Sequence, residues 1–298
     1  MNLAQFLNVA LLTQGAAAAL AFAWLGAHDH AVARWFACLL IALGYTVVLA
    51  LEFLMLLAVQ TRDQRERAPV RRLIAAFLHE VLWVPVVFYW RQPFRSNRYP
   101  DSALAEHPAQ PGVLLVHGHL CNRGLWNPWM RRYRERRIPY VAVNLEPFYG
   151  SIDSYGPVID QAVRKLQAMG ARPVVIVAHS MGGLAVRSWW RTTGGHPQVR
   201  RVVTIGTPHH GTWLARFALT ANTRQMSPHG PWLESLARDE PPERYRTFTC
   251  LYSDCDNIVY PSRWAVLEGA ENCALPNAAH LQMLFDERAF DAVDRYLR

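Results

Sequence analysis

The first 60 residues are dominated by two long apolar runs. Residues 3–25 contain no charged side chain, and residues 35–59 are interrupted only by Glu52. About 20 apolar residues in a helix suffice to cross the hydrocarbon core of a bilayer. The pattern therefore predicts two antiparallel transmembrane helices within residues 1–60. Glu52 is interpreted either as a functional carboxylate inside the membrane or as a side chain that snorkels towards the interface, and the second interpretation is favoured.

A third apolar segment, VLWVPVVFYW, covers residues 81–90 and contains Pro85. It is too short to span a bilayer, and its tryptophan and tyrosine side chains are typical of the headgroup region. The segment predicts a helix that lies in the membrane interface. Residues 61–110 are accordingly assigned to a basic interfacial segment and a linker, and the linker is rich in proline and alanine over residues 100–111.

The arginines after the second apolar run indicate the orientation of the chain. They form the densest positive cluster near either predicted span, and the positive-inside rule places such a cluster in the cytoplasm. The amino terminus and the part of the chain after residue 110 are then cytoplasmic as well. If residues 73–90 crossed the membrane, that later part would face the opposite compartment. The cluster consists of Arg62, Arg65, Arg67, Arg71 and Arg72.

After residue 110 the pattern changes to short β-branched runs that alternate with helix-like segments. Such alternation predicts an α/β domain, here residues 111–298, in which a mostly parallel sheet is covered by helices on both faces. Strands are expected at residues 113–117, 140–145, 174–178, 202–205, 248–252 and 264–267. Helices are expected at residues 128–136, 157–169, 183–191 and 281–297.

Composition and charge favour a membrane over a nucleic acid as the partner of this chain. The chain is 51% hydrophobic and carries a formal net charge of +8. Residues 1–98 hold nine arginines against five acidic residues, so half of the excess lies beside the apolar runs. Positive charge in that position suits the surface of a bilayer. We therefore expect a bilayer as partner and no nucleic acid.

The cysteines and histidines do not form a recognisable metal site. The cysteines lack CxxC spacing, and the adjacent side chains of His209 and His210 diverge with no nearby ligands to complete a set. No metal and no cofactor is expected. A single disulfide, Cys250–Cys255 or Cys255–Cys273, is left open for an oxidising compartment.

The segment PVVIVAHSMGGL at residues 173–184 predicts a nucleophile elbow. A buried strand ends at Ser180, and Gly182 and Gly183 then open a segment with helical spacing. In such a strand, turn and helix the serine hydroxyl is held above the carboxyl edge of the sheet. Ala178 replaces the usual first glycine, but its methyl group is still small. Ser180 is therefore the candidate nucleophile.

A serine hydroxyl needs a base to take its proton and an acid to orient that base. Asp256 follows a predicted strand in SDCDNIVYP, and His280 lies in NAAHLQML before the last predicted helix. The order Ser180, Asp256, His280 is the one found in α/β-hydrolases. Asp254 is the competing acid, since it also lies at the strand end, and Asp256 is favoured over it.

An oxyanion intermediate also requires backbone N–H donors that are in place before the reaction. LLVHGHLCN puts His117 and Gly118 at the end of the first strand of the domain. The N–H of His119 is therefore one expected donor, and the N–H of Met181, directly after the nucleophile, is the other.

Together these motifs resemble the bacterial lipases and esterases of the α/β-hydrolase superfamily, of the triacylglycerol lipase type. The resemblance rests on LLVHGHLCN, VAHSMGGL, TIGTPHHGT, SDCDNIVYP and His280. It implies an α/β-hydrolase fold, an acylated serine, and a mobile lid over an acyl pocket at residues 212–236. A buried structural insertion is the alternative to a lid. The substrate-binding residues expected in the lid are Trp213, Leu214, Phe217, Met226 and Trp232.

The resemblance and the apolar helices lead to the hypothesis of a membrane-anchored serine ester hydrolase. We expect an integral protein of a bacterial inner membrane that cleaves acylglycerols, phospholipids or lysophospholipids. Two alternatives stay open: an acyltransferase that uses the same triad, and a non-catalytic membrane scaffold with a hydrolase fold. The family sometimes binds structural calcium, but no oxygen-rich loop for it is apparent. The sequence gives no indication of the oligomeric state.

Overall fold

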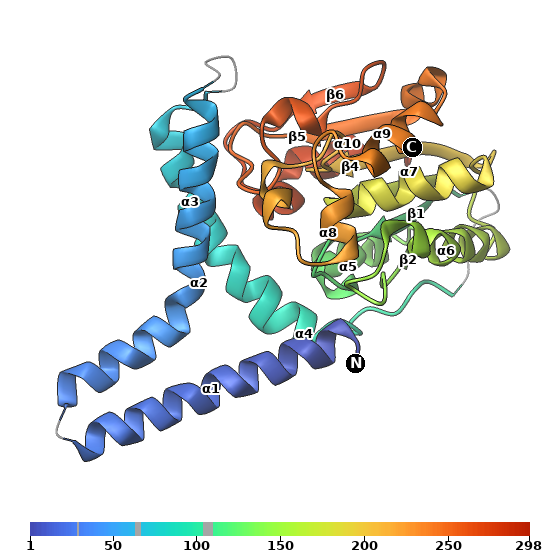
Figure 1. Ribbon diagram of the computed structural model, residues 1–298. Coiled ribbons are helices and arrows are strands. Elements are labelled where there is room, and N and C mark those ends of the chain that lie inside the picture. Colours follow the sequence, from blue (N-terminus) through green and yellow to red (C-terminus); the bar gives the residue numbers. More distant parts are fainter. Residues whose placement is uncertain (29, 63–66, 104–109) are drawn as a thin grey trace.

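The computed structural model describes residues 1–28, 30–62, 67–103 and 110–298. A helical amino-terminal part leads into a six-stranded sheet with helices on both faces, which confirms the predicted α/β architecture (Figure 1). Two parts of the sequence predictions lie outside the described residues: Arg65 of the basic cluster, and residues 104–109 of the linker.

The sheet has the strand order β2-β1-β3-β4-β5-β6, and every neighbouring pair is parallel. The first strand therefore lies next to the edge strand β2, β3 to β6 follow in order on its other side, and the carboxyl ends of all strands lie along one edge. The strands are β1 Gly112–Val116, β2 Tyr140–Ala142, β3 Val174–His179, β4 Val199–Ile205, β5 Phe248–Tyr252 and β6 Glu271–Ala274.

Both faces of the sheet are buried, because successive side chains of a strand point to opposite sides. Leu114 and Val116 of β1 pack in one core with helices α6, α7 and α9, whereas Val113 and Leu115 pack in the other with α5 and α10. This double burial explains the nearly continuous apolar runs of β1 and β3. The helices are α5 Asn127–Glu135, α6 Gly156–Ala168, α7 Met181–Thr193, α8 Ala221–Gln225, α9 Pro231–Arg238 and α10 Glu287–Asp294.

The amino-terminal part forms α1 (Leu3–Ala27), α2 (Ala31–Gln60) and a third helix that is longer than expected. The third helix, α3 (Val70–Val84), continues through a π-helical segment (Pro85–Arg91) into α4 (Gln92–Phe94). Among the described residues, three helices are long and apolar enough to cross a membrane: Leu3–Ala27, Val32–Gln60 and Val70–Phe94. The expected count of two long apolar helices is thus corrected to three.

Pro85 does not end the third helix, because the carbonyl that it leaves without a partner is satisfied from outside. A proline has no N–H to donate to the carbonyl four residues earlier. That carbonyl belongs to Val81, and it accepts a hydrogen bond of 3.0 Å from the Tyr45 hydroxyl of α2. The π-helical turn that follows widens the helix locally, which is a common way to accommodate such a break.

The second half of α2 and the third helix pack against the α/β domain. Phe53 and Leu56 of α2 form one apolar cluster with Ala76 of α3 and with Cys255 and Ala279 from loops of the domain. The other half of the helical part is different: α1 and the start of α2 extend away as a hairpin, and they carry many exposed large apolar side chains (Figure 1). A contiguous apolar surface of this kind marks a membrane or protein contact.

Two predicted elements of the α/β domain differ in the structure. Residues 264–267 do not form a strand: Ser262–Ala265 is a 3₁₀ turn, and the side chain of Asn272 binds both backbone groups of Leu267. The sixth strand is instead Glu271–Ala274, an edge strand whose half-exposed residues give a weak pattern. The predicted helix over residues 281–297 is interrupted at Asp286, whose extended backbone caps α10.

A buried ion pair in the α/β domain provides a test of its packing. Arg187 of α7 and Glu240 are almost completely buried, and their closest atoms, Nη2 and Oε2, are 2.5 Å apart. Glu240→Ala would leave the guanidinium buried without its charge partner, so the free energy of unfolding should fall by roughly 3–5 kcal/mol. Denaturant unfolding of the protein in detergent measures this loss.

The exposed pair Arg131–Glu135 on α5 is the matched control. Glu135→Ala should change the free energy of unfolding by only about 0.5 kcal/mol or less. Equal losses from the two substitutions would contradict the assignment of a special role to the buried pair.

Candidate active site

Ser180 lies in a sharp turn between β3 and α7. Its backbone has φ 53° and ψ −131°, a region in which residues other than glycine are strained. Close neighbours enforce the turn: a Cβ atom on Gly118 would lie 2.6 Å from the Cβ of Ser180, and one on Gly182 would lie 2.5 Å from the carbonyl oxygen of His117. The structure thus places Ser180 in a strand, turn and helix at the carboxyl edge of the sheet.

His280 and Asp256 lie next to each other, although 23 residues separate them. The Nδ1 atom of His280 is 3.0 Å from each carboxylate oxygen of Asp256. The Oδ1 atom of Asp256 also accepts hydrogen bonds from the backbone N–H groups of Ile258 and Val259, at 2.8 and 2.9 Å. The competing acid, Asp254, instead faces Arg72 on α3. The geometry therefore favours Asp256 as the partner of His280.

His280 differs from the neighbouring histidines in its protonation. Burial lowers the pKa of His280, but the negative charges of Asp256, Glu80 and Glu52 and a hydrogen bond to Asp256 outweigh it, so the net shift is upwards. Burial lowers the pKa of His117 and of His119 to about 4. Those two rings are consequently neutral at physiological pH, whereas the pKa of His280 lies above that of an ordinary histidine.

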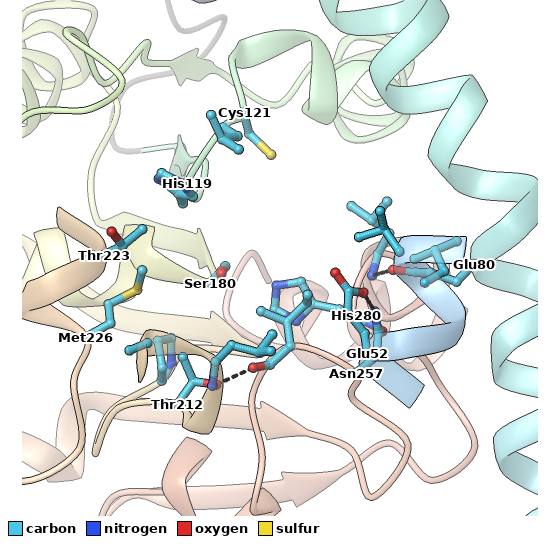
Figure 2. A pocket seen from close by; sticks show the side chains of 18 of the residues that line it. Glu52, Glu80, His119, Cys121, Ser180, Thr212, Thr223, Met226, Asn257 and His280 are labelled. Atoms are coloured by element: carbon cyan, nitrogen blue, oxygen red, sulfur yellow. Dashed lines mark hydrogen bonds between the residues drawn. The ribbon is translucent and has the colours of Figure 1, made fainter. Parts of the chain in front are cut away.

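Ser180 and His280 both line one apolar cavity of about 460 Å³ (Figure 2). The volume lies within the usual range of ligand pockets. Its walls come from three parts of the chain: the loop after β1, the segment predicted as the lid, and the apolar helices. The loop contributes His119, Leu120 and Cys121, the predicted lid contributes Thr212, Leu214, Ala215, Phe217 and Met226, and the helices contribute Tyr45, Val48, Leu49, Glu52, Glu80, Val84 and Phe88.

Three of the five substrate-binding residues predicted in the lid line this cavity, and the two tryptophans lie elsewhere. Trp232 packs against the core under α7, and its indole N–H donates to Asp153 at 2.7 Å. Trp213 stacks on Tyr260, with the ring centroids 6.3 Å apart. Phe217 lines the cavity and is nevertheless 63% exposed, so it lies at the rim.

The two expected oxyanion donors belong to segments next to Ser180. His119 follows Gly118, which contacts Ser180, and Met181 is the first residue of α7. The amino terminus of a helix attracts negative charge, because its first N–H groups have no partner within the helix. The oxyanion role of these two N–H groups stays a prediction.

Comparison with known proteins is consistent with this geometry. A family model described as "Alpha/beta hydrolase family" matches residues 113–296, which is more than half of the chain. The chain belongs to the α/β hydrolase family.

Solved lipase structures share the α/β hydrolase fold of this chain. The mature lipase BlEst2 of Bacillus licheniformis aligns with a TM-score of 0.58 and 21% identity, over 66% of this chain and 96% of that one. Lipase B of Aspergillus fumigatus aligns with a TM-score of 0.56 and 21% identity, over 66% of this chain and 54% of that one. At such identities the likeness shows a common fold.

The curated relatives match only a short part of the chain. The protein SERAC1 of Bos taurus is 33% identical over 97 residues, which cover 27% of this chain and 15% of SERAC1. The human SERAC1 protein gives 32% identity over the same length. The chain thus spans only a small fraction of the length of these relatives.

The sequence did not predict that the apolar helices contribute to this site. Glu52 of α2 accepts a hydrogen bond of 2.7 Å from the side chain of Asn257, so its carboxylate faces the α/β domain. The favoured interpretation, that Glu52 snorkels towards the membrane interface, is corrected by this contact. A carboxylate inside an otherwise apolar helix was the available signal, since such groups are costly without a partner. Glu80 of α3 is a second carboxylate in an apolar helix that has its partner in the α/β domain, the backbone N–H of Leu281.

The cysteines and the His209–His210 pair, which could in principle form disulfides or bind a metal, are arranged for neither in the described part of the chain. All five cysteines, each within the described residues, are free, so neither of the disulfides left open above is present. His209 is buried, and its ring lies 3.1 Å from the hydroxyl of Thr204. In the described part of the chain, no group of three or more His, Cys, Asp or Glu side chains is arranged to hold a metal ion.

The raised pKa of His280 predicts the acid limb of the pH–rate profile. A general base must be neutral, so activity is lost as the pH falls through its pKa. Because the pKa of His280 lies above the usual 6.5, kcat/KM should begin to fall at a pH above 6.5. The profile of kcat/KM against pH for a soluble ester tests this. Asp254→Asn should leave the acid limb of the profile unchanged. A wild-type profile whose acid limb has its midpoint below pH 6.5 would contradict the assignment of His280 as the general base.

Proposed function

We propose that this α/β hydrolase is a serine ester hydrolase that cleaves acyl esters of lipids at a membrane. The observation that carries the proposal is the hydrogen bond between His280 and Asp256 together with a strained Ser180, since Ser180 and His280 both line one apolar cavity. A nucleophile, a base and an orienting acid in this order are the requirements of acyl transfer to serine.

The mechanism follows from the positions of these groups. The Ser180 hydroxyl attacks the ester carbonyl, His280 takes its proton, and Asp256 orients the imidazole and stabilises its protonated form. The N–H groups of His119 and Met181 stabilise the oxyanion. His280 then returns the proton to the leaving alcohol, and water attacks the acyl-serine with His280 again as base.

The walls of the cavity support a lipid as substrate. Val48 and Leu49 of α2 and Val84 of the third helix line the cavity together with Leu214 and Phe217 of the predicted lid. An acyl chain in the cavity would therefore meet apolar side chains, some of them from a helix with the composition of a membrane span. Acylglycerols, phospholipids and lysophospholipids are the proposed substrate class.

We further propose that α1 and α2 cross the bilayer as a hairpin, while the third helix lies along the α/β domain. Both ends of the third helix contact the domain: Arg72 pairs with Asp254 at 3.7 Å, and Gln92 accepts the N–H of Asn122 at 2.6 Å. A helix fixed at both ends to one domain does not lead from it across a membrane. The amino terminus and the catalytic domain then share one side, with the cytoplasmic side of a bacterial inner membrane favoured and the periplasmic side as the alternative.

Substitution of the nucleophile and of the acid tests the proposed chemistry. Ser180→Ala should abolish both hydrolysis of p-nitrophenyl acyl esters and labelling by a fluorophosphonate probe. Asp256→Asn should lower kcat by roughly 1,000-fold or more, because the imidazole loses its orienting charge. Asp254→Asn, two residues away, should leave kcat unchanged. Undiminished hydrolysis by Ser180→Ala would refute the mechanism, and a lipid-product profile of membranes with wild type and Ser180→Ala would identify the ester.

A cavity-filling substitution tests the role of α2 as a wall of the acyl site. Leu49 lines the cavity, so Leu49→Trp should shift the ratio of kcat/KM from long towards short acyl esters by roughly tenfold or more. Leu51, on the exposed face of the same helix, provides the control Leu51→Trp, which should leave the ratio unchanged. An unchanged ratio in Leu49→Trp would show that the acyl chain binds elsewhere.

A further inference from the structure

Glu80 of α3 contacts the loop that carries the candidate base. Its carboxylate is almost fully buried, and Oε1 accepts the backbone N–H of Leu281 at 2.9 Å. Leu281 directly follows His280, so this contact fixes the backbone next to the imidazole (Figure 2). The hydrogen bond joins two segments that lie 201 residues apart in the sequence.

Glu52 of α2 reaches the same place through Asn257. Oε2 of Glu52 accepts a hydrogen bond of 2.7 Å from the side-chain amide of Asn257, which directly follows Asp256 (Figure 2). The amide oxygen of Asn257 in turn accepts the backbone N–H of His280 at 3.2 Å. Asn257 therefore links the acid loop to the histidine loop, and Glu52 orients Asn257.

We propose that Glu52 and Glu80 are positioning residues of the catalytic site, so that α2 and α3 hold the acid and histidine loops in their working geometry. The inference rests on the serine hydrolase function proposed above. The backbone N–H groups of His280 and Leu281 both depend on this arrangement, one through Asn257 and one directly. Neither loop belongs to a strand at these residues, so the sheet does not fix them.

A general docking role is the alternative, and Gln60 provides a matched control. Gln60 is a buried polar residue of α2 that also reaches the acid loop, since its amide donates to the carbonyl oxygen of Asp254 at 2.6 Å. Among the described residues, the side chain of Gln60 forms hydrogen bonds to Asp254 and Ala68, neither of which is hydrogen-bonded to His280. Loss of Gln60 should therefore weaken the packing of α2 without displacing the imidazole.

The experiment compares substitutions that remove the acceptor with substitutions that keep it. Glu52→Leu and Glu80→Leu in the full-length protein should lower kcat for a p-nitrophenyl ester by about 10- to 100-fold, because small displacements of catalytic groups are costly. KM should stay within about twofold, and fluorophosphonate labelling of Ser180 should slow in proportion to kcat. Glu52→Gln and Glu80→Gln retain an acceptor oxygen and should restore most of kcat. Gln60→Leu should lower Tm but keep kcat.

Several outcomes would overturn the inference. Wild-type kcat in both leucine variants, or an equal loss of kcat in Gln60→Leu, would leave only a docking role. If the leucine variants do not fold, Glu52→Asp and Glu80→Asp shorten the side chains while keeping the carboxylates, and undiminished kcat in these would equally overturn it. A failure of the proposed function would look different, because the wild type itself would then show no hydrolysis and no labelling at Ser180.

Discussion

The backbone of Ser180 imposes the constraint on which the rest of the site depends. A serine at φ 53° costs of order 1–3 kcal/mol, and it persists only where the surroundings leave no alternative. Here β3 lies between β1 and β4. A Cβ atom on Gly118 would clash with Ser180 itself, and one on Gly182 would clash with the carbonyl oxygen of His117. The apolar packing on both faces of the sheet offsets the strain and keeps the hydroxyl at the edge where the cavity begins.

The other half of the site has no such support from the sheet. Asp256 and His280 come from irregular loops, and the cluster of Phe53, Leu56 and Ala76 on the apolar helices covers these loops from outside. The helices thus have two environments along their length. Most side chains of α1 after its first turn and at the start of α2 are exposed, whereas the first turn of α1 and one face of the later part of α2 pack against the α/β domain. An exposed apolar segment and a wall of the candidate active site thus belong to one continuous helix, α2.

The sequence was most informative where local pattern determines structure. The buried β-branched runs predicted five of the six strands, and the elbow followed from a serine between such a run and two glycines. Periodicity failed where a distant partner decides the outcome. Tyr45 satisfies the carbonyl that Pro85 leaves free, and so allows a third long helix. The edge strand Glu271–Ala274 has few buried residues to reveal it.

The position of Glu52 shows why such contacts cannot be derived from the helix alone. A carboxylate in an apolar helix is tolerated when it reaches water or when a polar partner meets it, and the sequence of α2 is compatible with both. Only the fold brings Asn257, 205 residues later, to within 2.7 Å of its oxygen. Asn257 also accepts the N–H of His280, so the side chain that gives this partly buried carboxylate a partner is the same one that reaches the candidate base. The side chain of Asn257 therefore connects an apolar helix with the candidate active site.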